Sequence, residues 1–332
     1  RKWEDDIKSV IERQITEPLK EQSLHDQIPR ITDIQNTISQ SVRAQYEENP
    51  YPRWIKTGIV YKSRSLGAVL KSPPLLFDLG DYTSPENPDI LMAGCGTGQY
   101  ALFTASRFTN AQVLAVDLSL NSLAYAERKT EELGFSNIEY VQGDILELGK
   151  LERQFDLIGC TGVLHHLGDP LAGWQVLVDL LRPGGVMKIG LYSETARQHI
   201  IAGRSLIAKK GYSSSPDDIR RCRQEVISLA ADGNPAMAKI CNTLDFFTTS
   251  DCRDLLFHVQ ELRFTLPQIE AALTSLHLKF LGFEMRDQRT LRKFRESHPS
   301  TNARTSLSLW HEFELDNPDT FFGMYQFWCK KL

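Results

Sequence analysis

Residues 90–98 read Ile90-Leu91-Met92-Ala93-Gly94-Cys95-Gly96-Thr97-Gly98, a glycine-rich turn that follows a hydrophobic run. Glycines at alternate positions allow a sharp turn and a close approach of the backbone to a ligand. We expect a helix to begin near Gln99, with its unpaired N–H groups facing whatever the turn holds. Phosphate loops, dinucleotide-binding folds and ordinary tight turns use glycines in the same way, so the turn alone does not identify its ligand.

Apolar runs alternate with helical patterns after this turn. Strands are predicted at residues 113–116, 138–141, 155–158 and 186–192, with helices at 100–108, after Ser119 and at 171–181. Strict alternation of strands and helices predicts an α/β fold, in which a parallel sheet has helices on both faces. Ligands of such sheets bind at the carboxyl ends of the strands.

Polar residues follow several of these predicted strands. Asp117 and Asp144 end the second and third strands, and Thr161 and the pair His165-His166 follow the fourth. Asp117 lies about twenty residues beyond the turn, where a carboxylate can accept hydrogen bonds from ribose hydroxyls. A nicotinamide-binding fold would share this carboxylate, but it usually carries G-x-G-x-x-G, whereas the spacing here is G-x-G-x-G.

These motifs together resemble those of class I S-adenosylmethionine-dependent methyltransferases. The resemblance rests on five motifs in order: the glycine turn, Val116-Asp117-Leu118-Ser119, Gln142-Gly143-Asp144-Ile145, residues 155–167, and Leu181-Arg182-Pro183-Gly184-Gly185. It implies a Rossmann-like, seven-stranded, mostly parallel sheet in which strand seven is antiparallel and inserts between strands five and six. We expect strand six at residues 278–285 and strand seven at 321–328.

The resemblance also implies the cofactor and its contacts. The cofactor would be S-adenosyl-L-methionine, and the product S-adenosyl-L-homocysteine. The methionine end would lie on the turn, the ribose on Asp117, the adenine amino group on Asp144, and the ring faces on two apolar side chains. The expected cofactor-binding residues are Gly94, Cys95, Gly96, Gly98, Asp117, Leu118, Asp144, Ile145 and Thr161. The six cysteines form no C-x-x-C pair, so we expect no metal site.

One position departs from the family pattern. The family usually has an acid two residues before the first glycine, where this chain has Met92. Less negative charge then lies near the ammonium group of the cofactor. We expect another acid or a backbone carbonyl to compensate.

The flanks are expected to complete the domain. Residues 1–84 are predicted to be a helical N-terminal extension, and residues 85–332 the methyltransferase domain with a helical insertion at 193–262 that builds the acceptor pocket. Helical spacing predicts a first amphipathic helix ending near Pro18, with the apolar residues Trp3, Ile7, Val10, Ile11, Ile15 and Leu19. The segment 45–54, with the core, resembles bacterial methyltransferases that often follow tetratricopeptide repeats. We expect it to cover the cofactor as a lid, although a simple connector would have the same composition.

The chemistry expected at the site is an in-line displacement at an activated methyl group. The protein must align the acceptor and, for a hydroxyl, amine or thiol, remove a proton. Histidine suits that task near neutral pH. His165 and His166 are the first candidates, and His258 with Glu261 is the other, if that stretch is helical. Tyr51, Arg53 and Tyr192 could orient a carboxylate of the cofactor or of the acceptor.

The leading hypothesis is an enzyme that methylates an O, N or S atom of a small molecule. The alternatives are a protein or peptide methyltransferase and a non-catalytic cofactor-binding scaffold. The net charge of −4 over 332 residues does not favour binding to nucleic acid through bulk charge. No apolar run approaches the roughly 18–20 residues that span a bilayer, so we expect no membrane partner and a cytoplasmic location with reduced thiols.

Overall fold

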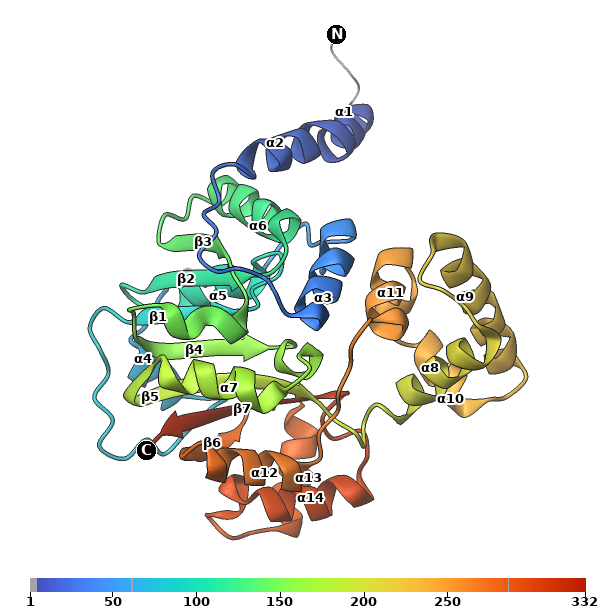
Figure 1. Ribbon diagram of the computed structural model, residues 1–332. Helices are drawn as coiled ribbons and strands as arrows, with labels where there is room; N and C mark the ends of the chain where they lie inside the picture. Colours follow the sequence, from blue (N-terminus) through green and yellow to red (C-terminus); the bar gives the residue numbers. More distant parts are fainter. Residues whose placement is uncertain (1–4, 61, 286) are drawn as a thin grey trace.

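A single seven-stranded sheet organises the chain (Figure 1). The computed structural model describes residues 5–60, 62–285 and 287–332, so Trp3 of the predicted first helix lies outside the described residues. The strands are β1 (Asp89–Ala93), β2 (Gln112–Asp117), β3 (Ile138–Gln142), β4 (Phe155–Thr161), β5 (Leu181–Tyr192), β6 (Leu278–Phe283) and β7 (Met324–Lys331). Their order is β3-β2-β1-β4-β5-β7-β6, and β7 is antiparallel to both neighbours, which confirms the predicted topology.

Helices cover both faces of the sheet. Successive side chains of each strand point to opposite faces, so both faces carry apolar residues that the helices bury. Ile90 and Met92 of β1 pack into one buried cluster, and Leu91 and Ala93 into another. The first cluster includes residues of α4 (Leu66–Leu70), α5 (Gln99–Arg107) and α6 (Leu120–Glu132). The second includes residues of α7 (Pro170–Asp179), α12 (Leu266–Ser275), α13 (Gln288–Ser297) and α14 (Leu307–Asp316).

Side-chain caps fix where two predicted helices begin. The Ser119 hydroxyl accepts from the backbone N–H of Ser122 at 3.1 Å at the start of α6. Thr265 and Gln268 form a capping box at the start of α12. Such caps satisfy N–H groups that have no partner within the helix. Because the capping residues can be recognised in the sequence, both helix starts were predicted correctly.

The N-terminal helix differs from its prediction. It runs through α1 (Asp5–Ile11), the π-helical turn η1 (Glu12–Thr16) and α2 (Glu17–Leu24), so it does not end at Pro18. Pro18 lies in the first turn of α2, after the wider π turn, where its missing N–H is tolerated. The apolar residues Val10, Ile15 and Leu19 are exposed, and the helix instead packs on α6 through Glu21, which binds Arg128 at 2.8 Å.

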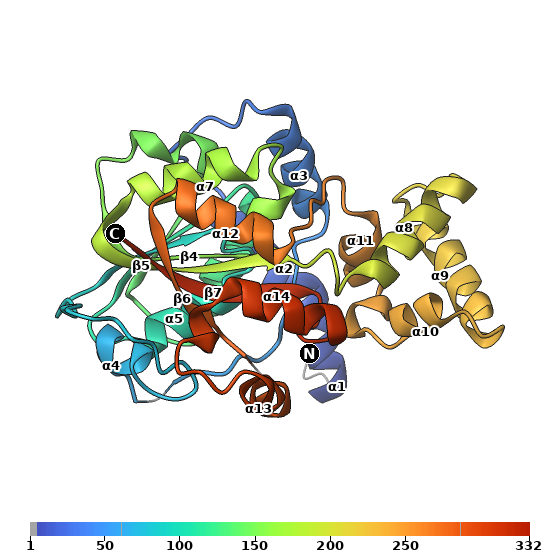
Figure 2. The same cartoon turned by 90° about the horizontal axis from the view of Figure 1, so that it is seen from below.

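The insertion after β5 forms a separate helical unit beside the sheet (Figures 1 and 2). It contains α8 (Gln198–Lys210), α9 (Pro216–Ala231), α10 (Pro235–Cys241), the 3-10 turn η4 (Leu244–Phe246) and α11 (Thr249–Phe257). Its buried residues form a cluster of their own, with Ile219, Cys222 and Ile240 at its centre. Within the described ranges, none of the helices has the length and apolar character needed to cross a membrane.

Candidate functional site

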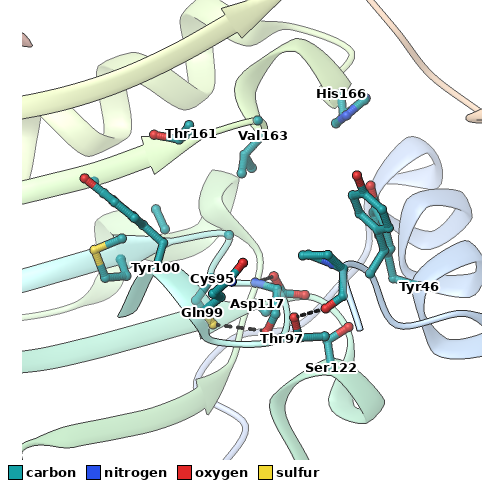
Figure 3. A pocket seen from close by; sticks show the side chains of 18 of the residues that line it. Tyr46, Cys95, Thr97, Gln99, Tyr100, Asp117, Ser122, Thr161, Val163 and His166 are labelled. Atoms are coloured by element: carbon teal, nitrogen blue, oxygen red, sulfur yellow. Dashed lines mark hydrogen bonds between the residues drawn. The ribbon is translucent and has the colours of Figure 1, made fainter. Parts of the chain in front are cut away.

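One cavity of about 880 Å³ lies at the carboxyl ends of β1, β2 and β4. Figure 3 shows the glycine turn on one side of it, Tyr46 of α3 (Thr37–Glu48) opposite, and Val163 and His166 after β4. The cavity therefore lies where the parallel sheet was expected to bind its ligand.

The glycine turn needs its glycines for two reasons. Gly94, Gly96 and Gly98 have φ values of +72°, +53° and +78°, a region that other residues rarely adopt. A Cβ on Gly94 would lie 2.4 Å from a methyl carbon of Val163, and one on Gly98 would lie 2.6 Å from the Cβ of Ala126. Gly94, Cys95 and Gly96 line the cavity, whereas Gly98 allows α6 to pack closely behind the turn.

Two carboxylates from neighbouring strand ends line the same cavity. Asp117 accepts the backbone N–H groups of Gly96 at 2.7 Å and Ser119 at 2.9 Å, and burial raises the pKa of its carboxyl group. Asp144 accepts the N–H of Leu146 at 3.0 Å through Oδ1, while its Oδ2 is buried without a partner among the described residues. A ligand amino group could supply the missing donor to Asp144. Leu118 and Ile145 line the cavity beside these acids.

Three further residues lie along the cavity near β4. The Thr161 hydroxyl is buried and has no hydrogen-bond partner among the described residues. Met92 lines the cavity with 4% of its surface exposed. Nearby in the lining, Lys188 of β5 binds Glu284 at 2.9 Å, a pair that sequence analysis missed. The sequence signal for this pair was a lysine inside the apolar run of β5. Burial disfavours the charged form of Lys188. Its interactions with Tyr100 and Glu284 favour that form more strongly, so the pKa of Lys188 is raised.

The segment after α3 lies on the glycine turn. The Thr97 hydroxyl donates to the carbonyl of Pro52 at 2.5 Å, and the Trp54 indole donates to the carbonyl of Thr97 at 3.0 Å. Tyr51 lines the cavity. Arg53 does not line it, because its guanidinium turns outward to Glu21 at 3.2 Å, so the expected role of Arg53 toward a carboxylate in the site is wrong.

The three candidate histidines pack against one another, and of the three only His166 lines the cavity. His165 is fully buried, stacks on Tyr192 with ring centroids 3.7 Å apart, and accepts the Tyr192 N–H through Nδ1. His258 stacks on His166 at 3.6 Å. Burial lowers the pKa of His165, lowers that of His166 to about 4 and lowers that of His258 to about 2, so all three are neutral at pH 7.

Two of the expected histidine roles are therefore corrected. His165 and His258 do not reach the cavity, because they pack behind Tyr192, His166 and Tyr46. His258 also has no carboxylate partner in Glu261. Helix α11 ends at Phe257, and Glu261 instead binds Arg197 at 2.8 Å.

The far side of the cavity is walled by tyrosines and acids, and we call this part the acceptor chamber. Its residues are Tyr46, Tyr51, Tyr192, Arg197, Asp245 and Asp254. The Tyr46 hydroxyl donates to Asp254 Oδ1 at 2.8 Å, and burial raises the pKa of Asp254 to about 7. Sequence analysis missed Tyr46, Asp245 and Asp254. An acid directly before the apolar run 255–257 was the signal for Asp254.

Comparisons with known proteins agree with this geometry. The methyltransferase domain family matches residues 90–185. An uncharacterized protein of Synechococcus sp. is 27% identical over 314 residues, covering 84% of this chain and 68% of that protein. The tRNA 5-carboxymethoxyuridine methyltransferase of Escherichia coli is 31% identical over 165 residues, covering 47% of this chain and 62% of that enzyme.

Solved structures share the fold. PKMT2 from Rickettsia typhi in complex with AdoHcy matches with a TM-score of 0.61 and 17% identity, over 83% of this chain and 54% of that chain. The chain thus spans between 54% and 68% of the length of these three proteins.

Proposed function

We propose that the chain is a class I S-adenosylmethionine-dependent methyltransferase, because residues 90–185 match the methyltransferase domain family, and that it transfers the methyl group to an oxygen, nitrogen or sulfur atom of a small molecule. The observation that carries this proposal is the single cavity, which joins the glycine turn and its two carboxylates to the acceptor chamber. An acceptor in the chamber would therefore share one cavity with the cofactor.

The residues at the strand ends fit the cofactor. The unpartnered Asp144 Oδ2 suits the adenine amino group, Leu118 and Ile145 suit the ring faces, and Asp117 suits the ribose. Gly94, Cys95 and Gly96 line the cavity where the methionine end is proposed to lie. When bound, S-adenosylmethionine supplies a methyl carbon that the positive sulfur has already activated.

The chain's part in the reaction is to align the acceptor and exclude water. The segment 45–54 is the proposed lid, since it is bonded to the glycine turn and supplies Tyr46, Tyr51 and Pro52 to the cavity lining. His166 Nδ1 lies 2.5 Å from the Gln260 carbonyl and carries the proton, which leaves Nε2 to accept a hydrogen bond from the acceptor. The insertion supplies Asp245 and Asp254 to the acceptor chamber.

Two measurements test this function. Calorimetry should show binding of S-adenosylhomocysteine, and tritium from methyl-labelled cofactor should appear in the small-molecule fraction of an extract of the source cells. Label in the protein fraction would favour a peptide acceptor, and label in the RNA fraction would favour an acceptor like that of the tRNA-modifying relative. Binding without any transfer would identify a scaffold and contradict the proposal.

A further inference from the structure

Among the described charged residues that line the cavity, both cations form ion pairs, whereas the acids of the acceptor chamber do not. Lys188 binds Glu284 at 2.9 Å, and Arg197 binds Glu261 at 2.8 Å through a guanidinium that lies 3.6 Å from the ring centroid of Tyr192. Both cations of the cavity wall are therefore neutralised by a carboxylate. Neither can attract a negatively charged acceptor strongly.

The two acids of the acceptor chamber have no such partner. Among the described residues, no ion pair links Asp245 or Asp254 to a cation, although both line the cavity. Asp254 has only 9% of its surface exposed. Its Oδ1 accepts from Tyr46, while its Oδ2 has no hydrogen-bond partner in the described part of the chain. Because Asp254 lines the cavity, a ligand bound there can supply a donor or a cation to this oxygen.

The orientation of Asp254 is fixed by two neighbours. The N–H of Gln260 donates to His258 Nδ1 at 3.1 Å, so the ring proton of His258 lies on Nε2 and points at the Tyr46 oxygen, 3.1 Å away. The Tyr46 hydroxyl must then donate to Asp254 Oδ1. This chain of hydrogen bonds holds Asp254 with Oδ2 as the oxygen left for the ligand.

We propose, as a refinement that rests on the methyltransferase function above, that the methyl acceptor is an amine, which enters as the ammonium cation and is received by Asp254 Oδ2. A carboxylate acceptor would face Asp245 and Asp254 without a free cation to offset them. An ammonium group supplies both the charge and the N–H donors that the chamber lacks. Tyr46 and Tyr51 also line the chamber, and aromatic rings attract cations.

In the proposed step, the ammonium group gives one proton to Asp254 Oδ2 and becomes a neutral amine. Its lone pair forms the new nitrogen–carbon bond, while the sulfur–carbon bond breaks and leaves its electron pair on the sulfur of S-adenosylhomocysteine. The product is a methylated ammonium ion, and Asp254 returns its proton to solvent. The raised pKa of Asp254, about 7, suits a group that accepts and releases a proton near neutral pH.

The first test identifies the atom that receives the label. Tritium from methyl-labelled cofactor, transferred in an extract of the source cells, should stay bound in alkali and be retained on a cation exchanger. Size separation then distinguishes a free amine from a lysine side chain. Release of labelled methanol by alkali would reveal a methyl ester, and a neutral stable product would reveal an ether or thioether; either result would overturn the amine assignment. Absence of any transfer would contradict the methyltransferase function itself.

The second test uses the shape-conserving variant Asp254→Asn. It should lower kcat about 100-fold, the usual range for loss of an acid–base group, and leave the affinity for S-adenosylhomocysteine unchanged. Asp254→Glu, which keeps the charge, should recover part of the rate even if Asn disturbs the helix. Asp232→Asn, an exposed acid of the same insertion, is the matched control. An Asp254→Asn rate equal to that of the control would overturn the proposal.

The pH profile provides an independent readout. The wild-type rate should rise through about pH 7 and then level off, and this inflection should be absent in Asp254→Asn. The charged and titratable groups that face Asp254 are Tyr46, Tyr51, Tyr192, Arg197, Asp245, His258 and Glu261. A histidine as the proton acceptor would instead give an inflection near pH 4, because burial lowers the pKa of His166 to that value.

Discussion

Burial decides what the histidines of this site can do. His165 and His166 follow β4, as expected of catalytic groups, and His258 follows α11, yet the three rings pack against one another and His165 stacks on Tyr192. Removing an imidazole from water disfavours its charged form, so proximity to the site does not make these groups effective bases. A buried acid gains proton affinity by the same physics, which is why Asp254 is the better candidate.

The proposed contact of Asp144 with the cofactor gives a prediction at this scale. Asp144→Asn keeps Oδ1, which caps the turn at Leu146, but replaces the free Oδ2 by an NH2 donor. A donor facing the adenine amino group should weaken cofactor binding about tenfold to a hundredfold, the loss of one hydrogen bond to a charged group. Calorimetry with S-adenosylhomocysteine measures this loss. Equal affinity in Asp144→Asn and in the exposed control Glu139→Gln would show that Asp144 does not contact the ligand.

The residues proposed to bind the cofactor could be predicted from the sequence, whereas those of the acceptor chamber could not. The glycine turn, Asp117 and Asp144 could be predicted from local sequence. Each lies at the end of a strand, and the residues of that strand predict it. Tyr46 and Asp254 are 208 positions apart and meet only because α3 and α11 lie on opposite sides of one cavity. Arg53 was misassigned for the same reason, because Glu21, its partner, lies on a distant helix.

At the scale of elements, α3 connects α6 to the insertion. Glu47 accepts the backbone N–H groups of Leu120 and Asn121, at 2.8 and 3.0 Å, and so caps α6 from another helix. Glu48 binds Arg253 of α11 at 2.7 Å, and the Gln45 side chain accepts the N–H of Val259. One helix is thereby attached both to the cofactor half of the cavity and to the insertion.

The Glu47 cap gives the second prediction. Glu47→Ala should destabilise the protein by about 1 kcal/mol, the usual cost of a lost helix cap, and increase hydrogen exchange at Leu120 and Asn121. Cofactor affinity should also fall, because the segment that follows α3 lies on the glycine turn. Ser41→Ala, an exposed change on the same helix, is the control. Unchanged exchange at both amides would refute the capping role.

The Glu48–Arg253 pair gives a third prediction, about opening. Glu48→Arg should repel Arg253, loosen α3 from α11 and speed the release of S-adenosylhomocysteine a few-fold, since a half-exposed pair contributes less than about 1 kcal/mol. Stopped-flow measurements would detect the change. The charge-swapped double variant Glu48→Arg/Arg253→Glu should restore the slower release, and failure to do so would mean that the pair does not link the two helices.

At the scale of the whole molecule, the insertion has a core apart from the cores of the sheet. Ile219, Ile240 and Leu256 pack with one another and not with the clusters on either sheet face. Ile240→Ala should therefore destabilise the insertion by about 2–5 kcal/mol, the usual cost of a large-to-small core change, and leave the sheet intact. Hydrogen exchange should increase in α8–α11 only. Cofactor affinity should persist while methyl transfer is lost, whereas Ile158→Ala in the sheet should weaken both.

Stability at acidic pH gives a prediction for the whole chain. A histidine whose folded pKa is lowered stabilises the fold above pH 6.5 and loses that contribution as pH falls toward the folded value. For His166, with a folded pKa of about 4, the loss is about 2 kcal/mol at pH 5. Asp254 acts in the opposite sense, because its raised pKa favours folding at low pH. Comparing the pH dependence of unfolding in His166→Gln with wild type isolates the histidine, and His25→Gln is the control. Identical slopes in both variants would contradict the burial effect.

The separate core of the insertion has a consequence for how the protein can evolve. Mutations that reshape α8–α11 can accumulate without disturbing the strands that carry the glycine turn, Asp117 and Asp144. Lineages can therefore exchange one acceptor for another while the cofactor half stays constant. Under the proposed function, similarity over residues 90–185 covers the residues assigned to the methyl donor and leaves out Asp245 and Asp254 of the acceptor chamber.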